Sequence, residues 1–511
     1  MRNFAEVLLP SDTDATALVV CGRPVTYRDL RSKVERWAAR LTESGLIPGD
    51  CVLIIDDNSL FYVAAYLSTI YAGGVAVPLS PSTSAKSLLA QVETSQARWG
   101  FVGRKYLERL REASANTGLN RVWVDAAPER GELPTEWESA AALQASDSGV
   151  WRPPVSRSPD DVAVINFTSG STGTPLGVMV SHRNLEANTQ SIVSRLALTR
   201  DDRALLVLPM SYCFGASILH THLAVGGTVV IASSFAYSER VLDELAASAC
   251  TGFYGVPSTY QILLRRSTFT TRQYPDLRYM AQAGGHLAPA LINEIRAAFP
   301  AVPFYVMYGQ TEATARLSAL APERLAAKAG SVGRSIPGVT LRVLRSDGQP
   351  ASVGEVGEIV ASGDNIALGY LGDPAATAAH FRDGHLWTGD LAVVDDDGDI
   401  FIRGRRRDFI KVGGQRVGSR EIEDVIAELA DVVEVAVFGV PHDTLGEAIA
   451  ACIVGRPLSN LDADDVIRHC RLRLGRDREP KFVEFFKELP KNEAGKVMKA
   501  ALKRAAAGSG I

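Results

Sequence analysis

The stretch that follows the apolar run 162–165 decides the architecture: Asn166-Phe167-Thr168-Ser169-Gly170-Ser171-Thr172-Gly173-Thr174-Pro175-Leu176-Gly177-Val178. Four hydroxyls and two glycines fall within residues 168–173. Backbone N–H groups of such a loop can turn toward an anion while the hydroxyls donate further hydrogen bonds. A flexible surface turn has the same composition, and a Walker loop is excluded because its lysine is absent. The stretch predicts a phosphate loop after a buried strand.

Strands and helices alternate on the N-terminal side of this loop. Apolar runs at 17–21, 51–55 and 75–78 predict buried strands, with a helix at 59–72. Thr26 followed by Asp29 predicts an N-cap, and the helix it opens ends at Gly45. This order predicts α/β structure with a largely parallel sheet to about residue 329. The Ala-, Ser- and Pro-rich segment 128–159 is expected to be a surface connection.

The spacing of turn residues and apolar residues changes after residue 329. Gly and Asp turns recur about every ten residues between short apolar alternations, which predicts a small β-barrel-like subdomain over about 330–403. A basic run at 403–411 separates it from a last α+β unit at 404–511, with a helix at 420–429 and strands at 433–440 and 448–454. The predicted fold is therefore α/β. Its domain 1–403 holds two α/β subdomains and the β-rich one, and a small mobile domain follows.

Composition excludes several classes of protein. The 511 residues are 46% hydrophobic and 22% charged, and the net charge is −4, so a dedicated nucleic-acid binder is excluded. The six cysteines include no CxxC pair, which excludes a zinc site of that spacing and favours free thiols. No membrane span and no signal peptide are expected, because long apolar runs are absent. A cytoplasmic location is expected.

Six motifs in a fixed order together resemble the acyl-adenylate-forming superfamily, which includes acyl-CoA synthetases, free-standing adenylation domains and luciferases. They span Thr168 to Lys496 and so cover most of the chain. The motifs are the loop at 168–177, Tyr308-Gly309-Gln310-Thr311-Glu312, Gly354-Glu355-Val356-Gly357-Glu358-Ile359 with Gly369-Tyr370, Trp387-Thr388-Gly389-Asp390-Leu391, Gly404-Arg405-Arg406-Arg407-Asp408-Phe409-Ile410-Lys411, and Pro490-Lys491-Asn492-Glu493-Ala494-Gly495-Lys496.

The resemblance implies roles for these residues. Lys496, Thr311 and Glu312 would be catalytic, with Glu312 also holding Mg²⁺ through a hard oxygen. ATP or AMP would contact the loop and the later motifs: Thr168, Ser169, Gly170, Ser171, Thr172, Gly173, Gly284, Gly285, Tyr308, Gly309, Asp390 and Arg405. Asp390 would accept from both ribose hydroxyls. The tunnel for the thiol acceptor would include Lys411, Gly413 and Gly414.

Two positions depart from the pattern of the superfamily. Leu176 stands where the loop usually carries a lysine, so one cation facing the outgoing pyrophosphate is missing. Arg407 occupies the hinge position, where aspartate or lysine is usual.

The resemblance also places an acyl pocket at Tyr212, Cys213, Phe214, Gly285 and His286. Members that activate amino acids carry aspartate where this chain has Cys213, and members that activate hydroxybenzoate carry asparagine. A buried ammonium beside a thiol would lack a partner, at a cost of several kcal/mol. An apolar acid is therefore expected, whether fatty, aryl or polycyclic. His286 is either a wall of the pocket or a polar contact to the substrate.

The predicted activity is ATP-dependent formation of acyl-AMP with release of pyrophosphate, followed by thioester formation with CoA. Four alternatives remain open: adenylation alone, with transfer to the phosphopantetheine of an acyl carrier protein or to a separate partner; thioester formation alone; non-catalytic binding of an acyl nucleotide; and luciferase-type oxygenation. Retention of Lys496 argues against the second, and retention of Glu312, Asp390 and Lys496 against the third.

Overall fold

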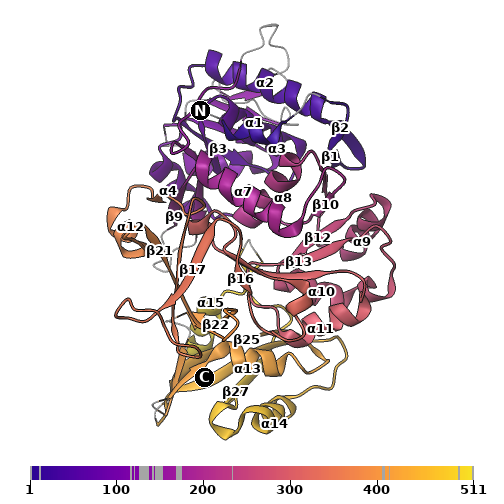
Figure 1. Cartoon of the computed structure of the whole chain (residues 1–511), viewed down its shortest axis with the longest axis vertical. Helices are drawn as coiled ribbons and strands as arrows, with labels where there is room; N and C mark the ends of the chain where they lie inside the picture. Colours follow the sequence, from indigo (N-terminus) through magenta and orange to yellow (C-terminus); the bar gives the residue numbers. More distant parts are fainter. Residues whose placement is uncertain are drawn as a thin grey trace.

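Two large sheets with the helices between and around them form the N-terminal part of the molecule, and a small C-terminal domain lies below them (Figure 1). The protein is seen in a computed structural model that describes residues 3–10, 13–114, 118–119, 121–125, 137–140, 143, 153–168, 175–232, 234–405, 409–413, 415–442, 444–492 and 495–508. None of the described helices combines the length and the hydrophobicity that crossing a membrane requires.

The first sheet has nine strands and is parallel through its centre. Its order is β16 (Arg334–Ser335), β15 (Ser318–Leu320), β14 (Phe304–Tyr308), β13 (Tyr279–Gln282), β12 (Gly252–Gly255), β10 (Arg203–Leu206), β11 (Thr228–Ile231), β1 (Thr16–Val20) and β2 (Arg23–Thr26). Only β2, β15 and β16 run antiparallel to their neighbours. The carboxyl ends of β12, β13 and β14 therefore meet at one edge.

The second sheet has eight strands, and the predicted phosphate loop leaves from one of them. Its order is β19 (Gly369–Tyr370), β9 (Leu176–Ser181), β8 (Val162–Thr168), β4 (Val75–Pro78), β3 (Cys51–Ile55), β5 (Trp99–Val102), β6 (Arg121–Val124) and β7 (Trp137–Ser139). The loop connects β8 to β9, which pair antiparallel, while β3 to β8 pair in parallel.

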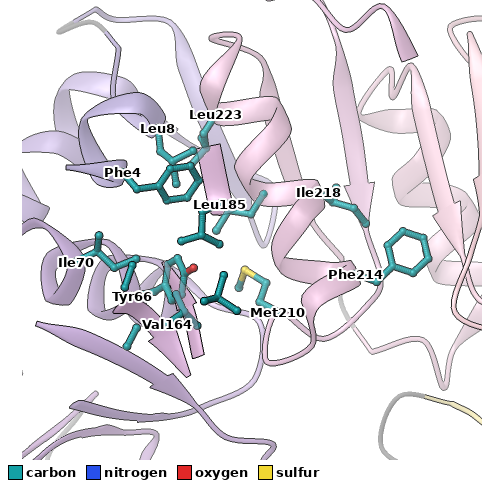
Figure 2. Close-up of a cluster of buried hydrophobic side chains, with 14 of the residues drawn as sticks. Phe4, Leu8, Tyr66, Ile70, Val164, Leu185, Met210, Phe214, Ile218 and Leu223 are labelled. Carbon is teal, nitrogen blue, oxygen red and sulfur yellow. The ribbon is translucent and has the colours of Figure 1, made fainter. Parts of the chain in front are cut away.

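A shared hydrophobic core joins the two sheets through helices packed between them. Figure 2 shows side chains of this core from α1 (Phe4–Leu8), α3 (Leu60–Tyr71), α7 (His182–Leu196) and α8 (Cys213–Ala224). Nearly every residue of α3 is buried, which explains why its sequence is apolar all round. The other helices of this part are α2 (Tyr27–Glu43), α4 (Ala85–Ser95), α5 (Leu107–Ser114), α9 (Ser238–Ala247), α10 (Pro257–Arg266) and α11 (Pro289–Ala298).

Two smaller sheets complete the fold. An antiparallel sheet contains β17 (Val339–Leu344), β18 (Gly357–Gly363), β20 (Phe381–Arg382), β21 (His385–Val394) and β22 (Ile400–Arg405), with α12 (Pro374–His380) beside it. The C-terminal domain holds β23 (Phe409–Val412), β24 (Gln415–Gly418), β25 (Val432–His442), β26 (Gly446–Gly455) and β27 (Phe482–Phe485). Its helices are α13 (Ser419–Ile426), α14 (Ala463–Leu474) and α15 (Lys499–Gly508).

The α/β class, the antiparallel sheet after residue 329 and the α+β C-terminal domain are confirmed. The capping box at the start of α2 forms as expected, because Thr26 Oγ1 accepts from the Asp29 N–H at 3.0 Å. The domain limit at 403/404 stays a prediction, and β22 runs across it to Arg405.

The sequence did not predict which strands pair. β1 pairs in parallel with β11, with Leu18 opposite Val229, and so lies in a different sheet from β3 and β4. A short buried strand carries no local signal for its partner, so the pairing depends on contacts distant in sequence. The segment 128–159 is not only a surface connection, because β7 lies within it and buries Trp137 against the sheet.

Candidate active site

The carboxyl ends of β13 and β14 carry the loops that open the site. Tyr308 ends β14, and Gly284 lies two residues after β13. Gly309 is required because a Cβ there would lie 2.0 Å from the Ala315 carbonyl oxygen, so the chain doubles back closely after it. In parallel sheets, ligands bind in the crevice beyond the carboxyl ends of the strands. Gly284, Gly309 and Tyr308 lie in such a place.

Asp390 links this edge to the antiparallel sheet. Its Oδ2 accepts from the Tyr308 hydroxyl at 2.7 Å, and its Oδ1 lies 3.1 Å from Nε of Arg405, its cross-strand neighbour. Burial, followed by the charge of Asp390, raises the pKa of Tyr308 well above its ordinary value, so this hydroxyl stays protonated and donates. The structure therefore brings together three of the residues predicted to bind nucleotide and holds the carboxylate in one orientation.

Glu312 is oriented by a second tyrosine. The Tyr370 hydroxyl donates to Glu312 Oε1 at 2.9 Å, which brings β19 of the second sheet to the motif that follows β14. Burial and the nearby Glu312 charge raise the pKa of Tyr370. Oxygen ligands are what Mg²⁺ prefers, and the Glu312 carboxylate is such a ligand. Sequence reasoning missed the role of Tyr370, although it quoted the residue as part of a motif.

Lys496 reaches this site from the C-terminal domain. Although its side chain is accessible to solvent, enough protein surrounds it that desolvation lowers the pKa of its ammonium. Arg405 acts in the same direction, while Cys213, Asp390 and Glu312 oppose it electrostatically. The lysine thus lies within electrostatic range of residues from three other parts of the fold.

A direct contact holds the Lys496 segment in place. The Ser258 hydroxyl at the start of α10 donates to the Gly495 carbonyl at 3.1 Å. Gly495 has φ +74°, and a Cβ there would lie 3.1 Å from the same hydroxyl, so this approach favours glycine. Ser258 belongs to no motif, and only the tertiary structure reveals its role.

The predicted acyl-pocket residues lie at the start of α8. Tyr212 is its N-cap residue, Cys213 its first residue, and Phe214 is largely buried. Cys213 Sγ lies 3.6 Å from Thr311 Oγ1, so the segment predicted to line the acyl pocket contacts the motif predicted to be catalytic. Burial raises the pKa of the Cys213 thiol, which is therefore neutral at physiological pH. Figure 2 shows Phe214 apart from the core side chains gathered around Tyr66.

His286 contacts the C-terminal domain. Its Nε2 lies 2.6 Å from Asp424 Oδ1 on α13, and the two side chains are 18% and 29% exposed. This nitrogen is occupied by a residue of the chain, so a polar contact from it to substrate is not what the structure shows. Gly285 lies beside it, where a Cβ would lie 3.0 Å from Pro257.

Several predicted residues lie outside the described residues: Ser169, Gly170, Ser171, Thr172, Gly173, Arg407 and Gly414. Thr168 ends β8 and its hydroxyl is 3.5 Å from the Leu176 carbonyl across the start of β9. Lys411 and Gly413 lie in the β23–β24 region, where their backbone N–H groups donate to Glu447 and Leu445 within the C-terminal domain. Their role in a thiol tunnel stays a prediction.

Arg316 was missed entirely. It is 2% exposed, and its Cζ lies 3.8 Å from the ring centroid of Phe214, in the predicted acyl pocket. The available signal was a lone cation in the otherwise uncharged segment 313–320, four residues after Glu312.

Two family models and full-length relatives match this chain over most of its length. Residues 9–371 match the family described as AMP-binding enzyme, and residues 421–496 match the AMP-binding enzyme C-terminal domain. Feruloyl-CoA synthase of Amycolatopsis sp is 32% identical over 492 residues, which cover 96% of either protein. The 3-(7a-methyl-1,5-dioxo-octahydro-1H-inden-4-yl)propanoyl:CoA ligase of Rhodococcus jostii (strain RHA1) is 30% identical over 515 residues, covering 98% of this chain and 96% of that protein. Among solved structures, ATP-bound MatB from Rhodopseudomonas palustris is similar with a TM-score of 0.87 and 29% identity, over 99% of this chain and 98% of that one.

Proposed function

We propose that this chain, which belongs to the AMP-forming acid–CoA ligase family of the adenylate-forming superfamily, converts an apolar carboxylic acid to its CoA thioester. ATP is its nucleotide. The acid would be fatty, aryl or polycyclic. The similar ligase of Rhodococcus jostii is named for a bicyclic propanoyl substrate, and the Amycolatopsis enzyme for feruloyl-CoA.

The observation that carries the proposal is the position of Lys496. In the first half-reaction, a carboxylate oxygen of the acid forms a bond to the α-phosphorus of ATP, and the bond to pyrophosphate breaks. An ammonium beside the reacting groups offsets the negative charge of both. Lys496 lies with Cys213, Asp390 and Glu312 in its electrostatic surroundings, which suits the adenylation step.

Other side chains of the site would orient the nucleotide and the metal. Asp390, held by Tyr308 and Arg405, would accept from the ribose hydroxyls. Glu312, with one oxygen bound to Tyr370, would hold Mg²⁺, which neutralises phosphate charge. Thr311 would place its hydroxyl near the acyl carboxylate, because it contacts Cys213 in the acyl pocket.

In the second half-reaction, the thiol sulfur of CoA attacks the acyl carbon, and AMP leaves with the bonding electrons. Thioester formation requires that the Lys496 segment make way for the thiol, so we propose that the C-terminal domain turns about Arg407. Lys411, Gly413 and Gly414 would then border the pantetheine arm. The acceptor is proposed to be CoA, with a carrier phosphopantetheine as the alternative.

Product analysis tests this proposal directly. The enzyme is incubated with ATP, Mg²⁺ and a panel of fatty, aryl and polycyclic acids, with and without CoA, while mass spectrometry follows acyl-AMP, AMP and acyl-CoA. Formation of acyl-CoA together with AMP is the expected result. Accumulation of acyl-AMP that CoA does not consume would contradict the second half-reaction. If no acid yields acyl-AMP but synthetic acyl-AMP is converted to acyl-CoA, the enzyme performs only the second half-reaction, and the proposed adenylation is refuted.

A further inference from the structure

Arg316 is a buried cation without a counter-charge in the described part of the chain. Its side chain makes one hydrogen bond among the described residues, a 3.4 Å contact from Nη1 to the carbonyl of Ala315. Its Nε is buried and has no acceptor there, and no ion pair forms within 4.0 Å. Charged groups are rarely buried unless they are paired, because desolvation costs several kcal/mol. Such a residue requires an explanation.

The backbone of Arg316 is held firmly in place. Asn188 of α7 donates from Nδ2 to the Arg316 carbonyl at 2.9 Å and accepts from the Arg316 N–H at 3.3 Å. Asn365 donates to the same carbonyl at 3.1 Å. Gly309 lies against it on another side, because a Cβ there would lie 2.7 Å from the Arg316 Cα. Three segments of the fold thus position this one residue.

The surroundings of the guanidinium are apolar or neutral. It stacks on the Phe214 ring, and its main electrostatic neighbours are Cys213 and Tyr254. Burial raises the pKa of both groups, so neither supplies an anion at physiological pH. Desolvation lowers the pKa of Arg316 only to about 10, so the cation persists. Within the described residues, then, nothing neutralises it.

The guanidinium also lies beside residues predicted to line the acyl pocket. Both Arg316 and Lys496 interact electrostatically with the Cys213 thiol, and that thiol contacts Thr311 of the catalytic motif. Cys213 thus links Thr311 to its sequence neighbour Phe214, on whose ring the guanidinium stacks. An acid whose reacting carboxylate lies near Lys496 would extend along Cys213 and the Phe214 ring toward Arg316.

We propose that the acid substrate carries a second carboxylate, at the far end of an apolar body, and that this carboxylate pairs with Arg316. The inference rests on the proposed function, narrows its acid to one with an apolar body and a second carboxylate, and adds a specificity-determining residue. Arginine suits this role because its fork of N–H donors matches a carboxylate geometrically. A buried ion pair completed by substrate also discriminates against acids that lack the second charge, since these leave the guanidinium unpaired.

Matched acids test the inference. For wild type, kcat/KM for pyrophosphate release is measured with benzoate, isophthalate and the monoamide of isophthalate, and with hexanoate, adipate and the monoamide of adipate. In at least one series, kcat/KM for the diacid is expected to exceed kcat/KM for both the monoacid and the monoamide by about tenfold or more. Arg316→Leu should remove this preference, and Arg316→Lys should retain part of it. Arg195→Leu is the control, because Arg195 on α7 also has a buried unpartnered Nε but donates to the Ser335 carbonyl instead.

The outcomes separate the two proposals. If wild type turns over monoacids and shows no preference for either diacid, the inference is overturned and the proposed function stands. An Arg316→Leu enzyme that keeps the diacid preference but raises KM for ATP also overturns it, because the guanidinium then serves the nucleotide. If no acid of the product-analysis panel or of these two series yields acyl-AMP, the proposed function itself fails. Should the Arg316 variants not fold, the wild-type preference alone decides.

Discussion

Lys496 is the residue on which we expect the proposed adenylation step to depend most. Lys496→Ala removes the ammonium near Asp390 and Glu312, so we expect formation of acyl-AMP to fall by about a hundredfold or more. Formation of acyl-CoA from synthetic acyl-AMP should change little, because that step does not need the same charge. The two half-reactions are measured separately by pyrophosphate release and by thioester formation.

The control for this experiment is Lys503→Ala, since Lys503 is an exposed lysine on α15 of the same domain. Both half-reactions should be unaffected by that change. Equal loss of the two half-reactions in Lys496→Ala would refute the assigned role.

Leu176 stands at the loop position where the resemblance to the superfamily predicts a lysine. It begins β9 and packs partly buried against the main core. Leu176→Lys restores a cation near the proposed position of the outgoing pyrophosphate, so we expect release to become faster by a few-fold. Leu176→Met serves as the neutral control of similar size. Identical rates in the two variants would mean that another group already supplies this charge.

At the scale of elements, α13 and the loop after β13 meet through one polar pair. Asp424→Asn weakens the contact to His286 and should slow adenylation, because the C-terminal domain is then held less firmly in the orientation that places Lys496. Thioester formation from supplied acyl-AMP should be unchanged or faster. Loss of this contact is expected to lower the adenylation rate about threefold to tenfold, which corresponds to the net contribution of about 1 kcal/mol of one ordinary hydrogen bond.

The matched control is Glu428→Gln. Glu428 follows α13 and contacts His469 at 3.0 Å, so this histidine–carboxylate pair lies within the C-terminal domain rather than between domains. A slowing of adenylation as large as that in Asp424→Asn would attribute the effect to stability of the domain and not to its orientation.

At the scale of the whole molecule, buried histidines make the fold sensitive to acid. Desolvation lowers the pKa of His182 to about 4, of His220 to about 3 and of His222 to about 4. Between about pH 6.5 and pH 4 the unfolded chain therefore binds more protons, and the free energy of unfolding falls as the pH falls. Each histidine contributes up to about 1.4 kcal/mol per pH unit.

Urea unfolding from pH 7.5 to pH 5.5 measures this loss. Asp56 acts in the opposite direction below about pH 6, because burial raises the pKa of its carboxyl to about 6. The folded chain then takes up this proton first, which stabilises the fold as the pH falls. His182→Asn keeps an acceptor for the Phe4 N–H. This variant should lose the contribution of one histidine to the slope of the free energy of unfolding against pH. A flat profile for wild type over this range would show that the buried imidazoles do not stay neutral.

The sequence alone was sufficient where the information is local. The capping residues Thr26 and Asp29, the strand at 51–55 and the Tyr308–Glu312 motif can be read within a few residues, because hydrogen bonds to nearby backbone and the spacing of apolar side chains are local properties. The family could be predicted for the same reason. Each motif carries its own chemistry in consecutive residues, and their order along the chain is visible without a structure.

The tertiary structure decided what depends on distant segments. Three contacts each join residues more than a hundred positions apart: the pairing of β1 with β11, the contact of His286 with Asp424, and the hydrogen bond from Ser258 to Gly495. The burial of Arg316 likewise results from α7, α8 and the segment at 365 packing around it. Sequence by itself determined which chemical groups are available and the local structure around them. Only the fold determined which of them meet, because desolvation and pairing of charge depend on neighbours that the chain supplies from elsewhere.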